Sequence, residues 1–193
     1  MTRYVMVIDQ RRCIGCHSCT VACRTWNKLP LDIVYNPVVT EGAQGTWPNV
    51  HKSWQPLLCM HCENPACVEI CPQGALYKRE EDGLVVQDKS KCIGCKTCIS
   101  ACPYGAPSYD EATSTTFKCD GCYDRRQRGE LPACVVACPG ANLALDDMES
   151  LQSTYTADIV SDENSGTKPN FVITVDAALA EEPDDTVVEN RTA

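Results

Sequence analysis

The sequence has little of what usually builds a hydrophobic core or a nucleic-acid-binding surface. Only two of its 193 residues are phenylalanine, and aromatic residues make up 6% of the chain. Large rings normally fill much of a core, so we expect something else to hold this fold together. Acidic residues outnumber basic ones by 26 to 17, and the formal net charge is −9 with cysteine counted as neutral. This charge argues against nucleic acid as a partner, because phosphates would be repelled.

Several functional signals are also missing. No apolar run approaches the ~18 residues that span a bilayer, so any membrane link would go through another subunit. The first residues, MTRYVMVIDQ, are neither long nor apolar enough for a secretory signal peptide, and we expect none. We find no phosphate-binding glycine loop, dinucleotide fingerprint or nucleophile–base pair. These absences argue against substrate chemistry within this chain.

Cysteine, in contrast, is abundant: the chain has sixteen. They form four quartets, and the third, within Lys91–Pro103 (KCIGCKTCISACP), has the C-x2-C-x2-C-x3-C-P spacing of a cubane iron–sulfur site. The first quartet repeats this spacing, the second has two extra residues after its second cysteine, and the fourth has eleven residues there, YDRRQRGELPA (Tyr123–Ala133). Cysteines two residues apart are poor disulfide partners. The pattern therefore predicts metal ligation.

The fourth cysteine of such a run lies about one helical turn beyond the third and faces elsewhere. In two-cluster ferredoxins it ligates the neighbouring cluster. An expected hairpin of residues 75–78 and 84–87 joins quartets two and three into one unit. Quartets one and four remain, and we expect strands at 4–8 and 142–145 to pair and complete a second unit.

If each fourth cysteine crosses in this way, the sequence predicts four [4Fe–4S] clusters. Their ligand sets are Cys13, Cys16, Cys19 and Cys138 for cluster 1; Cys23, Cys119, Cys122 and Cys134 for cluster 2; Cys59, Cys62, Cys67 and Cys102 for cluster 3; and Cys71, Cys92, Cys95 and Cys98 for cluster 4.

The expected fold class is α+β, with two ferredoxin-like two-cluster units interleaved in sequence, inserted loops and an irregular C-terminal tail. Residues 1–23 with 119–146 form one unit, and residues 59–118 form the other. Residues 24–58 form an inserted loop region that carries all three tryptophans; it either folds back over the clusters or contacts a partner. Residues 147–193 form a C-terminal extension that is partly mobile, with one more possible strand at 171–175.

Other residues near the quartets allow alternative interpretations. His17, His51 and His61 could in principle be ligands, but sixteen cysteines already satisfy four cubanes. Lys91, Lys96 and Lys118 flank ligands and could raise a cluster potential; we expect most of them to be solvated surface charges. Paired CxxC knuckles for structural zinc are a further alternative, although zinc needs no trailing C-x3-C-P.

Two stretches carry a family resemblance: HCENPACVEICPQGALYKREEDGLVVQDKSKCIGCKTCISACPYGAP and the later KCDGCYDR. Together they resemble the iron–sulfur subunit of dimethyl sulfoxide reductase and of the related polysulfide, thiosulfate and tetrathionate reductases. The similarity runs from about Tyr4 to Leu145 and includes the individual spacings of all four quartets. It implies an electron-transfer subunit with a molybdopterin-containing catalytic partner, often completed by a membrane anchor that exchanges electrons with quinone. It also supports the crossed ligand sets.

The resemblance also shapes what we expect of location and partners. Relatives commonly cross the membrane folded, carried by the signal of the catalytic subunit, which implies a membrane-associated complex on the extracytoplasmic face, with the cytoplasmic face as the alternative. A hydrogenase or formate dehydrogenase could use a similar subunit, but formate-dehydrogenase relatives usually carry a membrane helix. Residues 24–58 and Tyr123–Ala133 are the best candidates for partner contacts, because neither is needed to hold a cluster.

Overall fold

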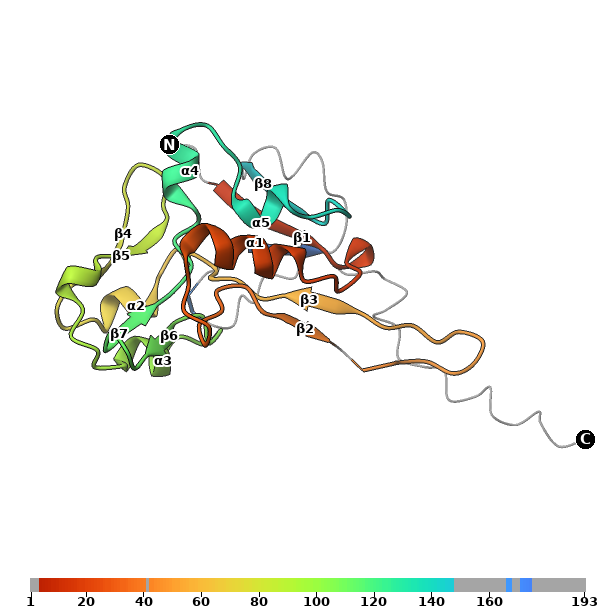
Figure 1. The fold of residues 1–193 in the computed structure, drawn as a ribbon, viewed down its shortest axis with the longest axis horizontal. Coiled ribbons are helices and arrows are strands. Elements are labelled where there is room, and N and C mark those ends of the chain that lie inside the picture. The colour runs from red at the N-terminus through yellow and green to blue at the C-terminus, as the bar shows by residue number, and fades with distance from the viewer. Residues whose placement is uncertain (1–3, 41, 148–165, 168–170, 175–193) are drawn as a thin grey trace, which may run out of the picture.

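The computed structural model describes residues 4–40, 42–147, 166–167 and 171–174. Figure 1 shows short helices and hairpins gathered at one end of the molecule and a three-stranded sheet beside the long helix α1 (Ser18–Asn27). The acidic segment 181–193 lies outside the described residues, as does most of the expected C-terminal extension.

The sheet joins segments from both ends of the described residues. Its central strand β1 (Tyr4–Asp9) pairs antiparallel with β8 (Leu143–Asp147) and parallel with β9 (Phe171–Thr174). Ile8, opposite Leu143, is fully buried. The predicted pairing of residues 4–8 with 142–145 is therefore confirmed. The predicted strand at 171–175 is present as far as Thr174, and its place beside β1 was not indicated by the sequence.

Two further hairpins follow the second and third quartets. Strands β4 (Leu76–Lys78) and β5 (Val85–Gln87) pair antiparallel around a turn at Gly83 with a φ of 71°. Strands β6 (Ser108–Asp110) and β7 (Thr115–Phe117) form the hairpin that follows the third quartet. The hairpin between quartets two and three is therefore confirmed.

The region 24–58 contains more regular structure than a loop. Its first residues belong to α1, which ends at Asn27. Further along, β2 (Val38–Thr40) pairs antiparallel with β3 (Trp54–Pro56). A bridge between Gln44 and His51 extends this ribbon, which projects from the body in Figure 1. The loop expectation was incomplete, because strands of three residues give too short a pattern to recognise.

The remaining helices are single turns that carry cysteines or lie beside them: α2 (Ala66–Glu69), α3 (Thr97–Ala101), α4 (Tyr123–Gln127) and α5 (Ala133–Val136). Proline at the N-cap position begins α2 and α5 with an extended backbone. Helix α1 packs against α5, and α2 packs against α3. These contacts bring the first quartet to the fourth and the second to the third.

Cysteines form part of the core itself. One buried cluster contains Ile8, Cys19, Leu58, Met60, Cys134 and Leu143, and another contains Cys23, Leu29, Ile33, Tyr35 and Phe117. The scarcity of aromatic residues is thus partly compensated by sulfur atoms, which are themselves apolar and polarizable. Over the part of the chain that the structure describes, no helix has the length and apolar character to cross a membrane.

Candidate metal centres

The loops of the first and third quartets have the same construction. Asp9 and Asp88 each accept a backbone N–H bond at the start of a 3₁₀ turn, η1 (Gln10–Arg12) and η2 (Lys89–Lys91), that leads into the first cysteine. The glycine of each CIGC motif then has a left-handed backbone, with φ of 65° at Gly15 and 67° at Gly94. Glycine adopts this conformation without steric cost, so the loop can curl and direct its cysteines inward.

A strand or hairpin covers each of these loops. A Cβ atom placed on Gly15 would lie 2.4 Å from Cδ1 of Trp54 in β3. On Gly94 it would lie 2.3 Å from the carbonyl oxygen of Ser114, in the β6–β7 turn. Both glycines are therefore required by close packing as well as by backbone conformation.

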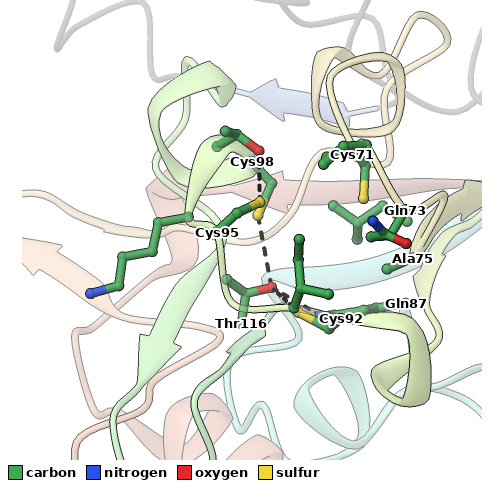
Figure 2. Close-up of a pocket in the computed structure, with 13 residues that line it drawn as sticks. Cys71, Gln73, Ala75, Gln87, Cys92, Cys95, Cys98 and Thr116 are labelled. Atoms are coloured by element: carbon green, nitrogen blue, oxygen red, sulfur yellow. Dashed lines mark hydrogen bonds between the residues drawn. The ribbon is translucent and has the colours of Figure 1, made fainter.

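One cavity is lined by Cys71, Cys92, Cys95 and Cys98, and Figure 2 shows Cys71 across the hollow from the other three. Cys71 comes from the second quartet and the others from the third. Thr116 of β7 places its hydroxyl 3.5 Å from Sγ of Cys92 and 3.8 Å from Sγ of Cys98. Burial raises the pKa of Cys98. At Cys92 burial acts in the same direction, but hydrogen bonds, chiefly from Thr116, outweigh it and lower the pKa.

A second cavity is lined by Cys13, Cys16 and Cys19 of the first quartet together with Cys138 of the fourth. Asn142 contacts Sγ of Cys138 through its side-chain oxygen. Burial raises the pKa of Cys13, and the nearby thiols of Cys138 and Cys16 raise it further. Cysteines that are far apart in the sequence therefore line the same cavity.

The remaining eight cysteines form two deeper groups. Burial, then the adjacent thiol of Cys122, raises the pKa of Cys23 to about 12. Cys119 and Cys134 are also close enough to Cys23 for its charge to raise their pKa values, after the larger effect of burial. This group therefore combines one cysteine of the first quartet with three of the fourth.

The other deep group lies around the second quartet. Burial raises the pKa of Cys67 to about 12, and the nearby thiols of Cys59, Cys102 and Cys62 add to the rise. Cys102, the last cysteine of the third quartet, thus lies beside the second quartet. Each group therefore includes cysteines of two quartets, and the crossed ligand sets themselves stay a prediction.

The donor chemistry of these groups fits iron–sulfur clusters. None of the sixteen cysteines forms a disulfide, and four thiolates are the ligands that a [4Fe–4S] cluster uses. Hydroxyl, amide and backbone N–H groups approach the sulfur atoms, including the N–H of Gly121, which donates to Sγ of Cys119 at 3.4 Å. Among the described residues, no three His, Cys, Asp or Glu side chains are grouped tightly enough to hold a single metal ion.

The three histidines are placed differently from one another. His17 is exposed at the start of α1, and His51 lies 3.2 Å from Oε1 of Gln44 in the ribbon. His61 occupies the CxxC position that glycine takes in the other quartets and keeps a positive φ of 42°. Its Nδ1 accepts the backbone N–H of Val85 at 3.1 Å. Burial, then the charges of Lys118 and Arg126, holds its pKa well below the usual value.

The three lysines near ligands also differ. Lys91 is exposed and lies 3.7 Å from Asp88, and Lys96 extends over the ring of Tyr109 at 3.7 Å. Lys118 is only 4% exposed. The prediction that most of these lysines are solvated surface charges is confirmed, and Lys118, which the end of β7 directs into the interior, is the exception. Thr116, Asn142 and Asn27, which also contact sulfur atoms, were not singled out because no spacing rule marks them.

Comparison with known proteins supports iron–sulfur binding by this chain. Two family models, both described as a 4Fe-4S dicluster domain, match residues 50–148 and 5–72. The sequence is 40% identical to the B subunit of anaerobic dimethyl sulfoxide reductase from Escherichia coli K12, covering 89% of this chain and 88% of that protein. It is 38% identical to the B subunit of selenate reductase from Mesobacillus selenatarsenatis, covering 87% and 70% of the two proteins.

A third relative is the B subunit of tetrathionate reductase from Salmonella typhimurium, 43% identical over 78% of this chain and 60% of that protein. Two dicluster domains and sixteen cysteines correspond to four [4Fe–4S] clusters. The chain therefore belongs to the family of the dimethyl sulfoxide reductase iron–sulfur subunit.

Proposed function

We propose that this chain is the electron-transfer subunit of a molybdopterin oxidoreductase complex. It passes electrons through its four clusters between a quinone-linked membrane anchor and a catalytic subunit of the dimethyl sulfoxide, polysulfide, thiosulfate or tetrathionate reductase type. The observation that carries this proposal is a pair of cavities, each lined by three cysteines of one quartet and the last cysteine of another. Relatives named as B subunits of reductases support the partnership.

Within this proposal, each cluster takes three ligands from one quartet and one from another. The sets are Cys13, Cys16, Cys19 and Cys138; Cys23, Cys119, Cys122 and Cys134; Cys59, Cys62, Cys67 and Cys102; and Cys71, Cys92, Cys95 and Cys98. Residues 1–23 and 119–146 then form one ferredoxin-like unit, and residues 59–118 form the second, interleaved in sequence. The β1–β8 pairing and the α2–α3 contact support this division.

Exposure suggests where electrons enter and leave. Cys16 and Cys95 are the exposed cysteines, and they belong to the first and fourth ligand sets. Cys119 lies close enough to Cys59 for one thiolate to raise the pKa of the other, after the larger effect of burial, so the second and third sets adjoin. An order of clusters 1, 2, 3 and 4 follows, with the outer two nearest the partner proteins.

The partners would be held by segments that bind no cluster. Trp47 at the end of the β2–β3 ribbon is 78% exposed. Trp26 lies under the guanidinium groups of Arg125 and Arg128, at 4.5 Å and 5.6 Å from its ring centre. The region 24–58 and the insert Tyr123–Ala133 therefore adjoin and could form one contact surface. The complex itself would be membrane-associated through its partners, on the extracytoplasmic face after co-export with the catalytic subunit.

No substrate site of its own is part of this proposal, and activity assays test that point. The isolated, dithionite-reduced chain should reduce sulfoxide, thiosulfate and tetrathionate at negligible rates, because it conducts electrons and its partner does the chemistry. The catalytic subunit alone should still turn over with an artificial dye donor. Quinol-driven turnover should require both and should fail when any one quartet is broken. Substrate reduction by the isolated chain at the rate of the complex would overturn the proposal.

A further inference from the structure

Lys118 is a buried cation at the junction of two cysteine groups. It follows β7 and directly precedes Cys119. Its Nζ donates hydrogen bonds to the carbonyl oxygens of Val85 and of Cys119, the latter at 2.7 Å, and lies 3.9 Å from Sγ of Cys59. The ammonium group is therefore fixed by three partners and touches both groups.

Lys118 is not found in an ion pair with any carboxylate of the described residues, at a limit of 4.0 Å between its Nζ and an Asp or Glu oxygen. Carbonyl oxygens satisfy its hydrogen bonds but carry no net charge, and burying an unpaired charge is costly. The thiol of Cys59, a proposed cluster ligand, lies 3.9 Å from this Nζ.

A cluster bound by four thiolates would supply the missing negative charge. Such a cluster is anionic in both redox states and gains one more negative charge on reduction. A nearby positive charge stabilises the reduced state more than the oxidised state, and it does so more strongly when water is excluded. The geometry thus gives Lys118 a direct electrostatic effect on reduction.

We infer that Lys118 tunes cluster potentials. Its fixed charge raises the reduction potential of the cluster bound by Cys59, Cys62, Cys67 and Cys102. It raises that of the neighbouring cluster, bound by Cys23, Cys119, Cys122 and Cys134, to a smaller extent. This inference rests on the ligand sets of the proposed function. It places the positive charge where an electron passes from one interleaved unit to the other.

Two variants of Lys118 distinguish the effect of its charge on the cluster potential from the effect of its hydrogen bonds. Lys118→Met keeps the length of the side chain and removes both its charge and its donors. Lys118→Gln removes the charge but keeps an N–H donor for the carbonyl oxygens. Lys91→Met is the matched control, because Lys91 also directly precedes a ligand cysteine but has a side chain that is 59% exposed.

The measurement is a redox titration of the purified complex, followed by electron paramagnetic resonance and accompanied by iron analysis. The signal of the cluster in question is identified as the one perturbed by Cys59→Ser. We expect its potential to fall in both Lys118 variants, with a smaller fall in the adjoining cluster and no change in the cluster of Cys92, Cys95 and Cys98. Lys91→Met should leave all four potentials unchanged.

Unchanged potentials in Lys118→Gln with full iron content would overturn the inference, since the charge would then have no effect. Loss of iron from both neutral variants would also overturn it, by assigning Lys118 to cluster assembly. Failure of the proposed function is recognised separately, in the unmodified protein. There, an iron content near eight per chain, half that of four cubanes, would contradict the four clusters whatever the lysine variants show.

Discussion

Thr116 connects two sulfur atoms of one cysteine group to the strands around them. Its hydroxyl lies near Cys92 and Cys98, and it accepts a hydrogen bond from Nε2 of Gln87 at 2.9 Å. Thr97 similarly lies 3.2 Å from Sγ of Cys95. Hydrogen bonds to sulfur stabilise the more negative, reduced state of a cluster. The environment of this group is therefore set by single side chains on β5, β7 and α3.

Cys102 provides the sharpest residue-level prediction. Its thiol lies beside Cys62 and Cys67, although it is closest in sequence to Cys98. Cys102→Ser should therefore perturb the same electron paramagnetic signal as Cys59→Ser, because serine weakens one ligand of that cluster. The comparison variant is Cys92→Ser, which should perturb a different signal. If Cys102→Ser instead matched Cys92→Ser, the crossed ligand arrangement would be wrong.

The candidate ligands could be predicted from spacing, whereas their surroundings could not. The C-x2-C-x2-C-x3-C-P spacing is a local pattern typical of ferredoxin-type cluster ligands, so it can be recognised in a sequence. Lys91 and Lys118 occupy equivalent positions before a cysteine, yet one is exposed and the other buried. The difference arises because β7 leads Lys118 beneath β5, and such a long-range contact leaves no local pattern.

At the scale of elements, each CIGC loop depends on a neighbouring ribbon. Gly15→Ala should destabilise the protein through a strained positive φ, about 1–2 kcal/mol, and through overlap with Trp54, about 1–3 kcal/mol more. Gly74→Ala is the matched control, since Gly74 has a φ of 57° but no atom of the described residues within 4 Å of an added Cβ. The measurement is the apparent melting temperature, which falls about 2–4 °C per kcal/mol in a chain of this size.

The two glycine variants should therefore differ. Gly15→Ala should also release iron to a chelator faster than Gly74→Ala, because the first quartet would be displaced. Equal melting temperatures would mean that the contact between Trp54 and the loop contributes nothing.

The elements themselves were predictable to different degrees. The β4–β5 hairpin was evident because Asp82 and Gly83 form a turn dipeptide between two apolar runs. The pairing of β1 with β8 followed from the order of the quartets. The place of β9 beside β1 did not, since so short a strand carries no information about its partner. The β2–β3 ribbon was missed because most of its residues are exposed and its strands are short.

At the scale of the whole molecule, the core is built around ligand cysteines. Cys19 and Cys134 are members of one buried cluster and Cys23 of the other. Every helix of the described residues is short except α1, and isolated helices of this length are unstable in water. The metal clusters would link strands, turns and helices through the cysteines of this core, so cluster binding and folding should be coupled.

Cluster removal tests this coupling. The intact chain should contain about sixteen iron atoms and sixteen acid-labile sulfides, four of each per cubane. After oxidative removal of the clusters and chelation of the iron, the chain should lose its near-ultraviolet circular dichroism and its cooperative thermal transition, and a protease should cleave it much faster. Reduction by dithionite is the control, because it changes the charge of the clusters but leaves them bound, and it should preserve all three properties. A cluster-free chain that kept its thermal transition and its protease resistance would show that the polypeptide contacts alone are sufficient for the fold.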